Sequence, residues 1–423
     1  MRALFSRTIR SLPLLLGLGL LIAPETVHAV RIGSTPFSLT GWFDAVQSLR
    51  THEPHDSLTS RARLRLELSG DFDALYSFAS LDAEKNWQID QETGVDPHEI
   101  WLEYAGRRWD VRVGRQIIIW GKADGVQITD IISPPDYTES ISRELDEVRL
   151  PVDALKVRWL GDYFDTELIW IPLFKAAVQA KGDNPWTVRQ EVPDHIHITT
   201  HGVDEPTTNL RNSELALKVS GYFSGLDVAA SVFYTWDDYA AYHRRVVPDG
   251  DDLLVTYFPR HHRLTVFGLE FSRPWSDFVF RGEAAWYVGR YLERDDLDAD
   301  PIAKDVVKWL GGVDWSPGND WSVIGQLTGD IIIDYDAALA DERQTCLATL
   351  NLSKQLLRQT LTLSAMLYYD LDDNEFYHRF KADYAVTGAF HLIGGADIFS
   401  SGDGRFGQYK GNSQIWIKAK YSF

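Results

Sequence analysis

The sequence contains a single cysteine, Cys346, among its 423 residues. One cysteine cannot form an intramolecular disulfide, so the fold must be stable without cross-links even if the protein is exported to an oxidising compartment. Long hydrophobic runs are also missing. After the N-terminal segment, no stretch approaches the roughly eighteen consecutive apolar residues that a transmembrane helix needs. If this protein is embedded in a membrane, strands in a closed barrel must span it.

An excess of positive charge is likewise absent. The chain has 42 Lys and Arg against 61 Asp and Glu, a formal net charge of −19 at pH 7. Nucleic-acid binding requires a basic footprint, so nucleic acid is not an expected partner. Local catalytic signatures are missing too: there is no Gly-x-Ser-x-Gly elbow, His-Glu-x-x-His, glycine-rich phosphate loop or Cys-x-x-Cys. We therefore expect no enzyme activity and no cofactor, with an outer-membrane hydrolase as a remote alternative because a Ser/His/Asp set needs no local motif.

The N-terminus has the three parts of a secretory signal peptide. Arg2, Arg7 and Arg10 precede an apolar run at 12–22, and a small-x-small site ends at Ala29. The apolar run is too short to span a membrane as a helix. The sequence predicts a cleaved signal peptide over residues 1–29 and one mature domain over residues 30–423.

The last residues of the chain alternate without a break. Ile415, Ile417, Ala419, Tyr421 and Phe423 share one face, and polar side chains occupy most of the other. A period of two is a β-strand, and an uncovered edge of this kind would aggregate unless it paired with the first strand and closed a barrel. The alternative is the last strand of a secreted soluble sandwich.

Seventeen further segments repeat the alternating pattern upstream. Their approximate spans are 36–50, 58–70, 73–82, 97–105, 109–119, 153–161, 163–172, 211–221, 226–236, 262–273, 277–289, 305–316, 320–332, 343–354, 358–371, 374–386 and 388–399, before the last at 411–423. Short connections alternate with long ones, apart from a short connection at 372–373. This asymmetry is typical of outer-membrane barrels with short periplasmic turns and long extracellular loops. We therefore predict an all-β, antiparallel transmembrane β-barrel of about 18 strands, with 16 as the alternative.

The predicted strands have two chemically different faces. At 58–70, leucines and Ala62 face one way while Arg61, Arg63, Arg65 and Glu67 face the other. A Lys or Arg on the lipid face costs about 2–4 kcal/mol at the midplane, so the charged face must line the lumen. The lumen is therefore predicted to be polar, with charges of both signs.

Two stretches carry a family resemblance. The final strand resembles the closing strand of bacterial outer-membrane β-barrels, whose terminal aromatic residue is read by the assembly machinery; this implies an assembly signal at Tyr421 and Phe423. The second stretch runs from Gly114-Arg115-Gln116 through Trp120-Gly121 to Pro134-Pro135-Asp136-Tyr137. It resembles uncharacterised porin-like outer-membrane barrels, distantly similar to alginate-export and substrate-specific porins. The resemblance implies that the loop at about 120–152 folds into the barrel and narrows it.

Acidic residues of this loop suggest how a constriction would act. Placed opposite Arg61, Arg63 and Arg65, they would create a transverse field that orients charged or dipolar solutes. The alternative is that these arginines pair with strand carboxylates such as Glu99 and Glu103. The predicted lumen and constriction residues are Arg61, Arg63, Arg65, Glu99, Glu103, Arg112, Asp124, Asp130, Asp136, Lys156, Arg158, Arg379 and Lys381.

Metal binding is not expected. His195, His197 and His201 lie near one another in the loop at 173–210, but they lack a helical period or a cysteine partner, which favours a solvated loop. Acidic clusters at 295–300 and 370–375 would lie beside lipopolysaccharide phosphates, where divalent cations are candidate partners and a merely solvated surface is the alternative.

These observations favour an outer-membrane porin that lets small hydrophilic or charged solutes diffuse passively through a polar lumen. Its expected partners are outer-membrane lipid, lipopolysaccharide, the barrel assembly machinery and the solutes themselves. A structural or partner-binding barrel, such as a sheath or an export component, is the second hypothesis, and it requires a wide lumen without an inserted loop.

Overall fold

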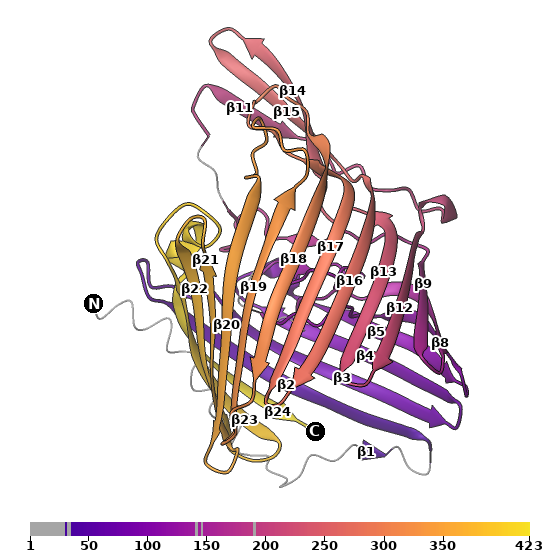
Figure 1. Cartoon of the computed structure of the whole chain (residues 1–423). Coiled ribbons are helices and arrows are strands. Elements are labelled where there is room, and N and C mark those ends of the chain that lie inside the picture. Colours follow the sequence, from indigo (N-terminus) through magenta and orange to yellow (C-terminus); the bar gives the residue numbers. More distant parts are fainter. Residues whose placement is uncertain (1–29, 32–34, 140–142, 145–146, 189–191) are drawn as a thin grey trace, which may run out of the picture.

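A computed structural model of the chain describes residues 30–31, 35–139, 143–144, 147–188 and 192–423. The predicted signal peptide, residues 1–29, lies outside the described residues. The described part of the chain is a β-barrel with a small sheet projecting from one end (Figure 1). No helix in these residues is long and apolar enough to cross a membrane.

Eighteen strands form the barrel within the described residues. They are β2 (Phe37–Arg50), β3 (Ser60–Phe72), β4 (Leu75–Asn86), β5 (Gly94–Ala105), β6 (Trp109–Gln116), β8 (Val152–Leu160), β9 (Phe164–Ile171), β12 (Glu214–Phe223), β13 (Leu226–Trp236), β16 (Arg263–Trp275), β17 (Phe278–Leu292), β18 (Ile302–Trp315), β19 (Trp321–Ile332), β20 (Gln344–Leu356), β21 (Leu361–Asp370), β22 (Glu375–Ala385), β23 (Phe390–Phe399) and β24 (Gln414–Ser422). Each predicted segment corresponds to one of these strands. The largest boundary difference is at β4, which runs to Asn86 where the pattern ended at 82.

The barrel closes between its first and last strands. β24 pairs antiparallel with β2, with Tyr421 opposite Phe43 and Ala419 opposite Ala45. The backbone groups of Gly41 and Phe423 add two hydrogen bonds of 2.9 Å. Closure satisfies the edge groups of both strands, which an open sheet would expose. The predicted antiparallel barrel of eighteen strands is confirmed.

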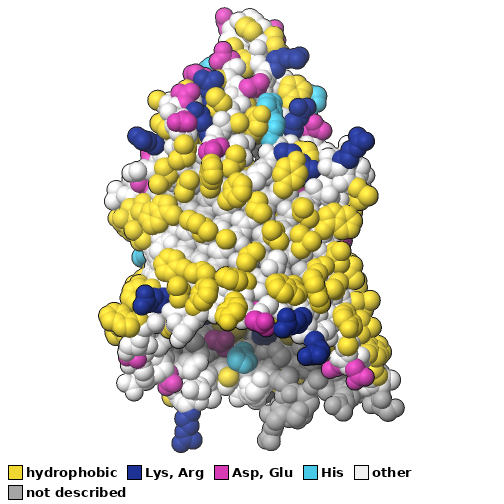
Figure 2. Space-filling model, turned by 45° about the vertical axis from the view of Figure 1, so that its right-hand side comes forward, with side chains coloured by type: hydrophobic (Ala, Val, Ile, Leu, Met, Phe, Trp, Pro, Cys, Tyr) yellow, Lys and Arg dark blue, Asp and Glu magenta, His cyan; other side chains and the backbone are white. Residues whose placement is uncertain are grey.

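The outer face of the wall is apolar. Ile100, Leu102 and Tyr104 on β5 are each about half exposed, as are many large apolar side chains on the other strands. Figure 2 shows such side chains spread over the middle of the barrel, while charged ones gather on the projecting sheet and the opposite rim. Aromatic pairs such as Trp109–Trp159 and Phe278–Trp315 lie at the short-turn end, with ring centroids 6.5 and 6.0 Å apart. An apolar band bordered by aromatic rings matches the hydrocarbon core and interface of a membrane.

Two long connections contain strands that the sequence analysis treated as loop. β11 (Ile196–Thr200) pairs in parallel with β15 (Asp252–Arg260), which forms a hairpin with β14 (Ala241–Asp249). These three strands make the projecting sheet of Figure 1. Aliphatic residues on both sides of an Asp-Gly turn are a hairpin signal that the prediction missed.

The remaining elements are short. β1 (Val30–Arg31) pairs with β2, and β7 (Asp136–Tyr137) pairs in parallel with β10 (Val178–Gln179). Short 3₁₀ helices occur at η1 (Asp90–Glu92), η4 (Leu210–Asn212) and η5 (Gly407–Asn412).

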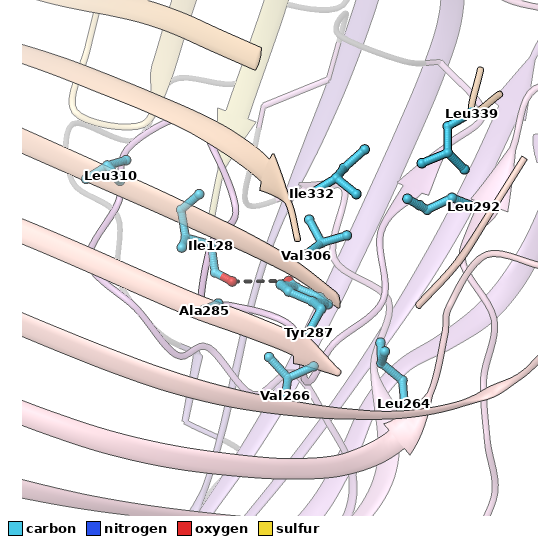
Figure 3. Packing of buried hydrophobic residues seen from close by; sticks show 10 residues of the cluster. All are labelled: Ile128, Leu264, Val266, Ala285, Tyr287, Leu292, Val306, Leu310, Ile332 and Leu339. Atoms are coloured by element: carbon cyan, nitrogen blue, oxygen red, sulfur yellow. Dashed lines mark hydrogen bonds between the residues drawn. The ribbon is translucent and has the colours of Figure 1, made fainter. Parts of the chain in front are cut away.

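The inner wall is not uniformly polar, which corrects the prediction of a polar lumen. In the half of the barrel nearer the long loops, Val266, Tyr287 and Val306 face inward and pack with Ile128 of the loop between β6 and β8 (Figure 3). A second cluster joins Trp120 of the same loop to inward residues of β8, β9, β12 and β13. The alternating pattern did not predict these apolar clusters. An apolar residue at an inward position only interrupts the polar–apolar alternation, and the sequence does not show which loop will pack against it.

Candidate functional site

The connection between β6 and β8, residues 117–151, passes through the interior of the barrel. Its first step is at Trp120, whose indole Nε1 donates to Glu167 of β9 at 2.7 Å and whose backbone N–H donates to Asp130 at 2.9 Å. Gly121 follows with φ +81°, and a Cβ there would lie 2.8 Å from the Thr129 hydroxyl and 3.0 Å from Glu283. The Trp-Gly pair is therefore where the chain leaves the wall, and only glycine fits the turn.

Inward side chains of the opposite wall hold the middle of the loop. Glu283 of β17 accepts hydrogen bonds from the backbone of Lys122 and from the backbone and hydroxyl of Thr129, the last at 2.7 Å. The Tyr287 hydroxyl donates to the carbonyl of Ile128 at 3.2 Å, drawn in Figure 3. The Tyr368 hydroxyl donates to the carbonyl of Gly125 at 3.1 Å. Buried backbone groups need partners, and here wall side chains supply them.

The arginines of β3 bind acidic residues of the loop directly. Arg61 Nη1 lies 2.8 Å from Glu139, and Arg63 Nη2 lies 2.6 Å from Glu147. Both guanidinium groups are 4% exposed. Arg65 instead pairs with Asp82 of the neighbouring strand at 2.5 Å. Arg61 and Arg63 therefore anchor the loop, whereas Arg65 forms a pair within the barrel wall.

A further arginine strengthens the anchor from within the loop. Arg143 contacts Glu139 at 3.2 Å and reaches Glu84 and Glu92 at 3.5 and 2.7 Å. Asn86 donates to Glu139 at 2.9 Å. The sequence analysis missed Arg143, Glu84, Glu92 and Asn86, because nothing in a local pattern shows which wall residues a loop will meet.

Burial and neighbouring charge act in opposite directions on these carboxyls. Burial by itself raises the pKa of Glu139, but Arg61, Arg143 and the Asn86 hydrogen bond outweigh it and bring the pKa to about 2. Glu147 behaves alike: burial raises its pKa, and Arg63, Lys418 and Arg61 lower it well below the usual range. Both side chains are therefore ionised at neutral pH, and the anchor is a set of true ion pairs.

The lowered pKa values of Glu139 and Glu147 lead to a prediction of how the loop responds to pH. A carboxyl with a lowered pKa stabilises the folded state above its unfolded pKa of about 4.3 and loses that contribution as the pH falls through its folded value. We expect single-channel conductance in planar bilayers to stay constant from about pH 8 to about pH 5, and to rise only as the pH approaches about 2. A rise near neutral pH would show that other groups hold the loop.

A second basic wall lies at β22. Lys381 Nζ is 3.0 Å from Glu144, and Arg379 lies 3.9 Å from the same carboxyl and 3.7 Å from Asp397. Burial raises the pKa of Glu144, but Arg379 and Lys381 outweigh it and lower the pKa below the usual range. Arg379 and Lys381 thus meet the loop as Arg61 and Arg63 do.

Three predicted constriction residues are not opposite the β3 arginines. Asp124 lies 3.7 Å from Arg281 of β17. Asp130 pairs with Arg149 at 2.7 Å, inside the loop, and Asp136 accepts a hydrogen bond from the Thr138 backbone at 2.8 Å. The predicted arrangement, acid facing base across an open gap, is therefore corrected: Asp124, Asp130, Glu139, Glu144 and Glu147 contact a base, and Asp136 accepts a hydrogen bond within the loop. Asp146, which the sequence analysis counts among these acids, lies outside the described residues. Order along a loop does not determine which wall each side chain meets.

The remaining predicted residues line the wall as cross-strand pairs. Glu103 contacts Arg112 at 2.5 Å, Lys156 lies 3.9 Å from Glu167, and Arg158 contacts Asp110 at 2.5 Å. Glu99 accepts from the backbone of Ile117 at 2.8 Å, where the loop begins. Neither Glu99 nor Glu103 pairs with the β3 arginines, so the alternative is wrong for these two carboxylates. A pair between an arginine of β3 and a carboxylate of a neighbouring strand does occur, between Arg65 and Asp82.

Above the crossing loop lies a chamber of about 830 Å³. Its walls come from the loop, from the inner faces of β13, β16, β17 and β20–β22, and from two further connections around residues 179–188 and 405–409. Trp186 and Phe406 of these connections are buried among inward aromatic residues. The sequence analysis predicted neither connection to enter the barrel.

Among the described residues, no group of three or more His, Cys, Asp or Glu side chains is arranged so that it could hold a metal ion. His197 contacts Asp252 at 3.3 Å in the projecting sheet. Divalent cations at the acidic loops remain a prediction.

Comparison with known proteins places this geometry among outer-membrane barrels. Residues 35–168 match the model of a family described as proteins of unknown function (DUF1302). No curated protein matches the sequence. The chain is similar to OccAB4 of Acinetobacter baumannii, with 8% identity, a TM-score of 0.50 and coverage of 93% of this chain and 100% of that one. It is also similar to OmpT, an outer membrane protein of Vibrio cholerae (12%, TM-score 0.47, coverage 92% and 99%), and to the outer membrane channel DcaP of A. baumannii (10%, TM-score 0.44, coverage 94% and 100%).

At such low identity the likeness to OccAB4 shows the fold alone. It agrees with the strand order and closure described above. The resemblance to porin-like barrels that the sequence indicated is confirmed, and the fold of this chain is that of a porin-like outer-membrane β-barrel.

Proposed function

We propose that the protein is an outer-membrane channel through which small hydrophilic or charged solutes diffuse passively. The observation that carries this proposal is the loop 117–151, pinned across the interior of a closed eighteen-strand barrel by buried ion pairs. A barrel of this size is wide enough for an aqueous path, and a fixed inserted loop sets its width.

The wall supports a location in a bacterial outer membrane. Its outer face carries apolar side chains and its short-turn end carries aromatic pairs, as a lipid-embedded barrel requires. The short turns would then face the periplasm and the projecting sheet the cell exterior. Export through a cleaved signal peptide and recognition of Tyr421 and Phe423 by the assembly machinery belong to the same proposal.

Charged pairs below the loop suit passage of polar solutes. Lys218 contacts Glu270 at 2.7 Å, and similar pairs occur on β5, β6, β8 and β9. Paired charges of both signs offer hydrogen bonds to a polar solute without trapping one ion. The sheath hypothesis, in contrast, required an unobstructed lumen, and the crossing loop occupies that space.

Planar-bilayer recording of the refolded protein tests the proposal. We expect steady conductance in the full-length barrel and a higher conductance when residues 122–148 are deleted, because the deletion removes the crossing segment. A matched control shortens the β14–β15 hairpin by deleting 243–258, which lies outside the barrel, and should leave the conductance unchanged. Absence of current from both the full-length barrel and the loop deletion would contradict the proposal and favour a partner-binding barrel.

A further inference from the structure

The chamber above the crossing loop is unusually aromatic for an aqueous path. Ten aromatic side chains, among the described residues, line its volume of about 830 Å³. This volume lies within the range of roughly 300–1,000 Å³ that is common for small-molecule sites. Charged residues such as Arg143, Lys308 and Arg379 also line the chamber and can replace the hydration that a polar solute loses, which its aromatic faces cannot. The aromatic faces favour a solute with an apolar body, at about 25 cal/mol per Å² buried.

The aromatic wall is packed before any solute arrives. Tyr377 stacks on Phe399 with ring centroids 4.7 Å apart and on Tyr368 at 5.6 Å. Trp186 covers this group from the connection after β9, its ring 6.2 Å from that of Phe399, and it is only 2% exposed. Rings held by one another form a rigid surface, so little conformational entropy is lost when a flat solute packs against it.

Two guanidinium groups on the chamber wall are each fixed by a carboxylate that contacts their Nε atom. Arg290 donates through Nε to Asp237 at 3.0 Å, and Arg405 contacts Asp370 through Nε at 3.3 Å. Within the described part of the chain, the terminal amino groups of neither arginine have a hydrogen-bond acceptor. A guanidinium fixed through Nε still offers its two amino groups to a carboxylate as a fork.

A second acid, Asp238, lies next to Asp237 in the chain. Asp238 lines the chamber, and its carboxyl makes no ion pair with any described residue. Burial raises the pKa of Asp238 well above its usual value, and the neighbouring Glu214 and Asp237 raise it further. Burial and the two neighbouring acids thus disfavour a second negative charge beside Arg290, and Arg290 itself acts in the opposite direction by lowering the pKa of Asp238.

We propose that this chamber binds an amphipathic organic anion, with a ring-bearing apolar body against the aromatic wall and its carboxylate on Arg405, while Arg290 adds a second positive charge to the lining. This rests on the proposed channel function and deepens it, because it assigns the class of solute that pauses above the constriction. Small hydrophilic solutes would cross the same path without binding.

Titration calorimetry of the full-length barrel in detergent measures this binding independently of conduction. The probes are 2-naphthoate, the neutral alcohol 2-naphthylmethanol and acetate. We expect 2-naphthoate to bind saturably, at least about tenfold more tightly than the alcohol, because a charge-assisted hydrogen bond is roughly twice as strong as a neutral one. Acetate, which has the charge without the body, should give no measurable binding.

Variants separate the two halves of the site. Arg405→Gln, at an exposed position, should lower the affinity for 2-naphthoate by about tenfold and leave that for the alcohol unchanged. Tyr409→Ala, on the chamber wall, should weaken both. The matched control Arg108→Gln removes a guanidinium that is also exposed, at the short-turn end, where Arg108 pairs with Asp162 at 3.1 Å, and should change neither.

Several outcomes would overturn the inference. These are equal affinity for the acid and the alcohol, binding of acetate as tight as that of 2-naphthoate, an effect of Arg108→Gln as large as that of Arg405→Gln, or no binding of any probe. A barrel that conducts but binds no probe removes this inference alone. A barrel that binds 2-naphthoate but never conducts removes the channel proposal and keeps the site.

Discussion

Replacing Glu139 by alanine is expected to release the crossing loop from the β3 wall and raise the single-channel conductance. Glu139 accepts from Arg61 at 2.8 Å, from Arg143 at 3.2 Å and from Asn86 at 2.9 Å, and its side chain is 2% exposed. Removing it leaves two arginines buried with only part of their counter-charge. Breaking a buried pair in this way costs about 3–5 kcal/mol. Here the loss destabilises the docked position of the loop and leaves the hydrogen bonds between the strands intact.

Conductance and limited proteolysis together measure this effect. The loop contains Arg143 and Arg149, so trypsin should cut the variant rapidly there while the native loop resists. Asp403→Ala is the matched control, because it removes an acid whose side chain is 98% exposed and whose only described partner is Lys410 at 3.2 Å. Surface pairs contribute little, about 0–1 kcal/mol, so the control should behave as wild type. If Glu139→Ala conducts like wild type and resists trypsin, the ion pairs do not set the loop position.

Placing an arginine at Leu269 is expected to destabilise the barrel by about 2–4 kcal/mol in lipid. Leu269 is at the centre of β16, faces outward and is 62% exposed. Its neighbours across the strands, Ala230 and Ala284, offer no acceptor for a guanidinium. The charge would therefore lie in the hydrocarbon core unless the bilayer deforms.

Denaturant unfolding from lipid vesicles measures the difference. Trp275→Arg is the control, because Trp275 ends the same strand at the short-turn rim and an arginine at the interface costs only about 0–1 kcal/mol. A water-soluble sandwich would tolerate an arginine at an exposed position, so equal stability of the Leu269 variant and wild type would contradict membrane insertion. The comparison thus tests the environment of the wall without depending on transport.

The strands could be predicted because each carries its own two-faced pattern. β3 shows this most directly: Leu64, Leu66 and Leu68 alternate with arginines, and the structure places every one of these arginines inside. Lipid outside and water inside impose the same period of two on each strand, and the resulting signal does not depend on neighbours. The hairpin at 241–260 was missed although it has an Asp-Gly turn, because its strands were read as part of a long loop.

The candidate site was predicted only in outline. The charges of Arg61, Arg63, Arg379 and Lys381 and the unusual Trp-Gly stretch were visible, and acids of the loop were expected opposite the β3 arginines, but which of those acids would meet them was not. Glu139 and Glu147, rather than Asp124, meet the arginine wall. The aromatic chamber was invisible because Trp186, Tyr377 and Phe406 come from three separate parts of the chain.

The sequence by itself determined that about eighteen strands with two different faces form the wall and that the last strand closes on the first, since these follow from a local period and from the need to pair every edge. Only the tertiary structure decided where the crossing loop is held, which acids meet which arginines, and that apolar clusters line part of the lumen. Those features depend on contacts between residues far apart in the chain, such as Arg61 with Glu139 and Tyr368 with Gly125, and no local pattern encodes them.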